Sequence, residues 1–97
     1  MGQGTLLFRA SLGDVLRAER MRQGMTLREL SSSARVSLGY ISEIERGQKE
    51  ASSELLASLC SALDLPLSVV LREVSDLVAL EESLAAQAAD EVVASAA

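Results

Sequence analysis

Apolar residues recur at intervals of three and four along five stretches of this chain, which is the spacing of amphipathic helices. The first predicted helix begins at the N-cap residue Ser11, with Asp14 three positions later as its capping-box partner, and ends at Gly24. No stretch shows the alternation of apolar and polar residues that is typical of strands, so the pattern predicts an all-α fold. The apolar side of the first helix is expected to consist of Leu12, Val15, Leu16 and Met21.

Two short helices are predicted next, close together in the chain. The earlier one begins at the T-x-x-E capping box that opens with Thr26, and the later one is capped by Ser37 and ends at Gly47. Helices joined by the few residues around 35–37 cannot lie antiparallel and must cross steeply, which is the helix-turn-helix arrangement. The inward-facing residues of the pair are expected to be Leu27, Leu30, Ala34, Ile41 and Ile44.

Two further helices complete the pattern. A fourth begins at Ser52 or Ser53, and Pro66, the only proline, separates it from a fifth. The fifth, over residues 67–90, is expected to be roughly 35 Å long, which is more than a globule of this size needs. Its apolar row, interrupted by Glu81, consists of Val70, Val74, Leu77, Leu84 and Ala88.

The composition argues against an enzyme or a metalloprotein. The chain of 97 residues has no histidine, which is the commonest general base and metal ligand. Its one cysteine, Cys60, lies in an apolar helical stretch and is expected to be a small buried residue; a reactive or metal-bound thiol is the alternative. No glycine-rich phosphate loop, paired reactive residues or metal-ligand spacing stands out. We therefore expect no catalytic residue, metal or cofactor, in a cytoplasmic protein without a membrane segment.

Charge is distributed unevenly along the chain. Residues 1–49 hold 8 basic and 5 acidic side chains, whereas residues 67–97 hold one basic and six acidic ones. The net charge of −5 for the whole chain therefore conceals a mildly basic first half. A basic surface next to a helix-turn-helix pattern favours a nucleic-acid partner.

The segment "TLRELSSSARVSLGYISEIERGQKEASSELL" carries a family resemblance, and "SEIERG" after "VS" is its strongest mark. From Gly13 to about Leu67 the chain resembles the Xre/Cro-type helix-turn-helix regulators, and most of all the actinobacterial clp gene regulators. The resemblance implies a lambda-repressor-like domain over residues 11–66, made of four to five short helices, before the long C-terminal helix. This chain has Ser31 where the family usually has alanine and Arg35 where it often has glycine. If the turn needs a positive φ, Arg35 costs about 1 kcal/mol.

The resemblance also implies roles for individual residues, with double-stranded DNA as the partner. In a helix-turn-helix domain the first turn of the later helix enters the major groove. Gly39 would allow close approach to the groove; the alternative is that it relieves a contact with a neighbouring helix. For any single arginine the alternative role is a solvated helix face. The residues expected to face base edges are Leu38, Gly39, Ser42 and Glu43, and those expected to contact phosphates are Arg28, Ser37, Tyr40, Arg46 and Lys49.

Arg20 and Glu45 match a pair of family positions that form a structural ion pair between the first and third helices. We expect this pair to fix the recognition helix in place rather than to contact DNA.

A domain that reads only half a site binds weakly, so the resemblance implies a homodimer. The dimer interface is expected on the fifth helix, at Val70, Val74, Leu77 and Leu84; the alternative is that this row packs on its own domain, at least over 67–71. The resemblance implies a transcriptional regulator that activates Clp protease and stress-repair genes. An activator of this kind is expected to have RNA polymerase as a further partner. A repressor or antitoxin of the same fold, and an adaptor that does not bind DNA, remain as alternatives. Residues 91–97 are expected to form a flexible alanine-rich tail, and its Ala96-Ala97 end is either a signal for a Clp protease or a frayed helix.

Overall fold

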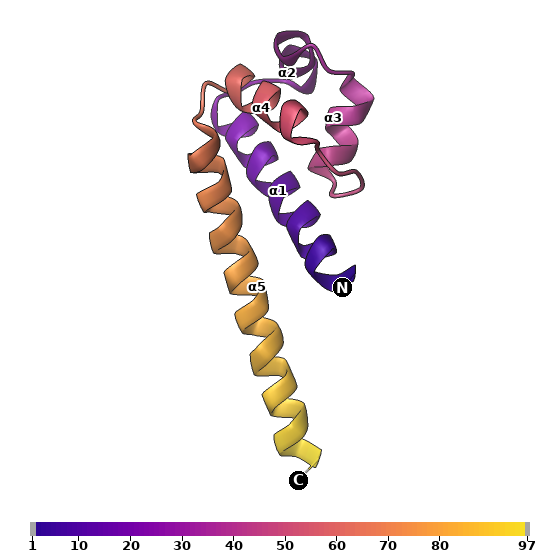
Figure 1. The fold of residues 1–97 in the computed structure, drawn as a ribbon, viewed down its shortest axis with the longest axis vertical. Coiled ribbons are helices and arrows are strands. Elements are labelled where there is room, and N and C mark those ends of the chain that lie inside the picture. The colour runs from indigo at the N-terminus through magenta and orange to yellow at the C-terminus, as the bar shows by residue number, and fades with distance from the viewer. Residues whose placement is uncertain (1, 97) are drawn as a thin grey trace.

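The computed structural model describes the backbone of residues 2–96 and the side chains of residues 7–90. In Figure 1, α2, α3 and α4 gather at one end of the molecule, while α5 runs alongside α1 in the opposite direction and continues past it. The extents of 56 × 22 × 21 Å reflect this protruding helix. The predicted all-α fold with one long C-terminal helix is confirmed. Over the described backbone there is no strand, and the five helices are α1 (Gly2–Arg22), α2 (Leu27–Ala34), α3 (Leu38–Glu45), α4 (Ser53–Ala62) and α5 (Leu67–Ala96).

The starts of α2, α3 and α4 follow from local capping, as predicted. The Thr26 hydroxyl accepts from the Glu29 N–H at 3.0 Å, and the Thr26 N–H donates to the Glu29 carboxylate at 2.8 Å. The backbone and side-chain hydrogen bonds to Thr26 lower the pKa of the Glu29 carboxyl, because they favour its charged form. Ser37 and Ser52 cap α3 and α4 in the same way, by accepting from backbone N–H groups three residues on.

The predicted start of the first helix at Ser11 is wrong. The helix α1 already begins at Gly2, and Ser11 lies in its interior with only 4% of its surface exposed. A hydroxyl in this position cannot cap a helix end, and no proline interrupts residues 2–10. Met21, which was expected on the apolar side of α1, is 57% exposed.

The core consists almost entirely of aliphatic side chains from all five helices. Cys60 belongs to it as a small apolar residue, as expected, and burial raises the pKa of its thiol. Val70 and Val74 are 0% and 2% exposed, because the first part of α5 packs against α1. Both residues were predicted in the dimer interface, and this prediction is wrong, since a side chain buried inside one chain cannot meet a second copy. The start of α5 therefore contributes to the same hydrophobic core as the other four helices.

The far end of α5 is described only in part. The helix continues to Ala96, but its side chains are described only as far as residue 90. The predicted tail over 91–97, with its Ala96-Ala97 end, lies beyond the residues whose side chains the structure describes.

Among the described residues, no single helix is long and apolar enough to cross a membrane. The segments Ser53–Ala62 and Leu67–Asp90, which meet at 108°, reach such a composition only when the two are counted together.

A glycine allows α1 and α3 to approach each other closely. A Cβ atom on Gly13 would lie 2.5 Å from the carbonyl oxygen of Ile44 and 2.6 Å from that of Glu45. Real Cβ atoms essentially never come so near to backbone atoms. Any residue other than glycine at this position would therefore force one of the two helices to shift. The angle between α1 and α3 therefore depends on Gly13.

Gly13→Ala is expected to lower the free energy of unfolding by about 1–3 kcal/mol, because the added methyl group overlaps backbone atoms of α3. Gly39→Ala is the matched control. A Cβ atom there meets no atom within 4 Å, so the same change should raise the free energy of unfolding by about 1 kcal/mol through helix propensity. Denaturant titration measures both values, and a Gly13→Ala variant as stable as the unmodified protein would contradict the close packing.

Candidate nucleic-acid interface

The turn between α2 and α3 has the left-handed residue that the family resemblance suggested. Arg35 has a φ of 59°, a conformation that costs a residue with a side chain about 1–2 kcal/mol. Two hydrogen bonds hold the turn: the Val36 N–H donates to the Ser31 carbonyl at 3.2 Å, and the Ser31 hydroxyl donates to the Val36 carbonyl. The turn therefore fixes the start of α3 relative to α2.

The outward side of α3 carries the four residues predicted to face base edges. Leu38 is 39% exposed, Gly39 is exposed, and Ser42 and Glu43 are half-buried. Because a methyl group on Gly39 would meet no atom within 4 Å, the idea that this glycine relieves a contact with a neighbouring helix is wrong within this chain. An exposed leucine beside a glycine leaves the backbone of this turn open to a close partner.

Polar side chains near α3 already have partners. The Arg46 guanidinium donates to the Ser42 hydroxyl and, at 3.3 Å, to the Gln48 amide oxygen. The Tyr40 hydroxyl donates its proton to the Glu50 carbonyl at 3.0 Å, so donation to a phosphate requires this bond to break. The hydroxyl of Ser37 accepts from the Tyr40 N–H as the cap of α3.

Arg28 and Lys49 are exposed at the start of α2 and in the loop after α3. Neither forms an ion pair with another described side chain, so both positive charges are available to an anionic partner.

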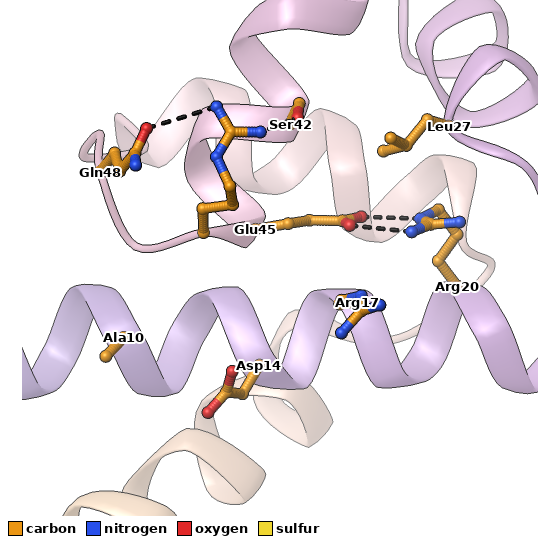
Figure 2. A pocket seen from close by; sticks show the side chains of 9 residues that line it. Ala10, Asp14, Arg17, Arg20, Leu27, Ser42, Glu45 and Gln48 are labelled. Carbon is orange, nitrogen blue, oxygen red and sulfur yellow. Dashed lines mark hydrogen bonds and ion pairs between the residues drawn. The ribbon is translucent and has the colours of Figure 1, made fainter.

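The predicted partners Arg20 and Glu45 lie against each other in the structure. Arg20 donates to both carboxylate oxygens of Glu45, at 2.7 Å from Nε and 2.9 Å from Nη2 (Figure 2). The two side chains are only 11% and 5% exposed, and the hydrogen bond to Glu45 raises the pKa of Arg20. Arg20 also donates to the Met25 carbonyl at 2.9 Å, so one guanidinium joins the end of α1, the turn before α2 and the end of α3.

Two residues without a predicted role also lie beside α3. Arg17 and Gln48 line a groove between α1 and α3, together with Ser42 and Arg46. The position of Gln48 follows from the loop after α3 and leaves no periodic signal in the sequence. Arg17 does leave one, because it lies three residues before Arg20 and four after Gly13 on the same face of α1.

Glu45→Ala is expected to lower the free energy of unfolding by about 2–3 kcal/mol, because it leaves the Arg20 guanidinium without its partner in a mostly buried site. Glu43→Ala is the matched control, since it removes a half-buried glutamate from the same helix that has no ion pair. Thermal melting compares the two variants. An unchanged melting temperature for Glu45→Ala would show that the pair does not stabilise the fold.

Comparison with known proteins places this geometry in a family. The helix-turn-helix family profile matches residues 16–70. The chain is 65% identical over 79 residues to the transcriptional regulator ClgR of Mycobacterium tuberculosis, covering 81% of this chain and 70% of that protein. A crystal structure of the clp gene regulator ClgR from Corynebacterium glutamicum is 49% identical, with a TM-score of 0.73 over 92% of this chain and 88% of that one.

A more distant relative has the same fold. The restriction-modification controller protein C.AhdI from Aeromonas hydrophila is 28% identical, with a TM-score of 0.60 over 67% of this chain and 92% of that one. These relatives are regulators rather than enzymes, which confirms the expectation of a non-enzymatic protein. With α2 and α3 joined by a short turn and the outward side of α3 open, the chain belongs to the helix-turn-helix family of DNA-binding transcriptional regulators and is similar to ClgR.

Proposed function

We propose that this protein binds a pseudo-palindromic operator as a homodimer and activates genes of Clp proteolysis and stress repair. The main support for this proposal is the outward side of α3. Leu38 is exposed there, and no atom of this chain lies near the position of a Cβ on Gly39, so the surface is open to a partner. The regulated genes are inferred from one relative, ClgR of Corynebacterium glutamicum, which is named a clp gene regulator in two crystal structures.

Each residue on the outward side of α3 has a chemical counterpart in the major groove. Leu38 can lie against the methyl group of thymine, and Glu43 can accept from the amino group of cytosine. Ser42 can donate or accept, although it must share its hydroxyl with Arg46. Phosphate contacts from Arg28, Arg46 and Lys49 then supply the sequence-independent part of the affinity.

The protruding part of α5 supports a homodimer. Every described residue from 79 to 90 is exposed, and Leu80 and Leu84 are 54% and 51% exposed. A helix without tertiary contacts is marginally stable in water, so an apolar stripe on this segment favours a partner. We propose that Leu77, Leu80 and Leu84 pair with a second copy and so set two α3 helices about 34 Å apart on one face of DNA.

The acidic character of α5 agrees with this arrangement. The protruding end leads away from α3, so its carboxylates lie far from the surface proposed to meet DNA (Figure 1). RNA polymerase would contact the dimer when it activates transcription. A Clp protease would act on the Ala96-Ala97 end, which would make the regulator a substrate of the proteolysis that it controls.

Selection from a random pool of double-stranded DNA tests the function. The expected result is a palindrome whose half-sites are about one helical turn, ~34 Å, apart. Leu38→Ala and Glu43→Ala should each reduce discrimination at one base position by about 1–3 kcal/mol, without loss of binding to unrelated DNA. Recovery of no sequence preference would contradict the proposal and favour an adaptor role. Reporter expression from the recovered site then distinguishes activation from repression.

Leu84→Glu is expected to weaken dimerisation at least about tenfold, because it buries an unpaired charge in the proposed interface. Ala86→Glu is the matched control, since it adds the same charge about half a turn away on α5. Analytical ultracentrifugation over a concentration series measures the dissociation constant. Equal dimerisation of both variants would exclude this stripe as the interface.

A further inference from the structure

The face of α1 that packs against α3 also carries an exposed arginine. Ala10, Gly13, Arg17 and Arg20 follow one another at intervals of three and four, so they share one face of the helix. Gly13 lies against the backbone of α3, and Arg20 binds Glu45 at the end of α3. Because Arg17 lies between these two contacts and is exposed, its side chain emerges beside the C-terminal half of α3.

The acidic groups near Arg17 do not neutralise it. The carboxylate of Glu45 in the same groove is already paired with Arg20. Asp14 also borders the groove, but it forms no ion pair within 4 Å, and its side chain lies on the opposite side of α1 from Glu45 (Figure 2). Within the described side chains Arg17 has no ion-pair partner at all, so its charge faces solvent uncompensated.

The opposite side of the groove belongs to the proposed DNA-reading surface. Ser42 and Arg46 line it from α3, and Arg46 is bonded only to neutral groups, those of Ser42 and Gln48. A DNA duplex bound to the outward side of α3 would therefore place one of its phosphate backbones near this groove. The guanidinium groups of Arg17 and Arg46, which have no acidic partner among the described side chains, lie on its two sides.

We propose that Arg17 on α1 contacts a backbone phosphate of the bound duplex, so that the DNA interface extends beyond α2 and α3 onto the first helix. This inference rests on the proposed function. A phosphate contact carries no sequence information, so Arg17 contributes affinity and its salt dependence but not the choice of operator.

The test compares Arg17→Ala with Arg72→Ala, Arg17→Lys and the unmodified protein. Arg72 is an exposed arginine on α5 that does not line the groove, so its removal changes the net charge equally without touching the groove. Each protein is titrated with the selected operator and with a random-sequence duplex between about 50 and 200 mM salt. Arg17→Ala should make the slope of log K against log salt about 0.9 less steep on both duplexes. Arg17→Lys should keep the slope, and Arg72→Ala should match the unmodified protein.

Each other outcome overturns the inference in a recognisable way. If the two alanine variants lose affinity equally, only the overall charge matters. If Arg17→Ala changes the preferred sequence instead of the slope, the arginine reads a base. If the unmodified protein selects an operator and Arg17→Ala binds it unchanged, the inference fails while the proposed function stands. If the unmodified protein binds no duplex, the proposed function fails and the inference fails with it.

Discussion

The contact between α1 and the end of α3 fixes the orientation of α3, the helix proposed to read DNA. Gly13 lets the two backbones meet, and the ion pair between Arg20 and Glu45 closes the same contact about two turns further along α1. The guanidinium of Arg20 also donates to the Met25 carbonyl in the turn before α2, so this side chain links α1, α3 and the start of α2. A helix of only eight residues such as α3 has little stability of its own, and its direction must come from such tertiary contacts.

The same contact divides the surface of the molecule into parts with different roles. One part consists of the outward residues of α3. The exposed basic groups of α1, of α2 and of the loop after α3 lie on the same side of the contact. On the other side, the part of α5 that protrudes from the domain carries acidic side chains together with the exposed leucines Leu80 and Leu84. A protein with net charge −5 can therefore present a basic surface to a polyanion, because residues 1–49 hold 8 basic and 5 acidic side chains, while α5 holds six acidic side chains and one basic one.

Local signals in the sequence predicted the middle of the fold well. Thr26, Ser37 and Ser52 begin their helices because capping depends only on residues three positions away, which the sequence displays directly. The start of α1 was missed because Ser11 has the chemistry of a cap, whereas only the packed structure reveals that it is buried in mid-helix. The pairing of Arg20 with Glu45 was expected from the family resemblance, and spacing alone would not have suggested it.

Residues whose role depends on tertiary neighbours were harder to predict. The row on α5 has one helical period throughout, so the sequence cannot reveal that α1 covers Val70 and Val74 but leaves Leu84 exposed. Arg17 shares a face of α1 with Gly13 and Arg20, but this periodicity indicates a role for the arginine only once the groove beside it is known.

The outward side of α3, held in place by α1, is the surface proposed to meet DNA. Amide chemical-shift mapping of the protein during titration with its selected operator tests this most directly. We expect the largest changes on residues 37–49 and on the neighbouring face of α1, with little change over 79–90. Changes concentrated on α5, with α3 unaffected, would contradict this proposal.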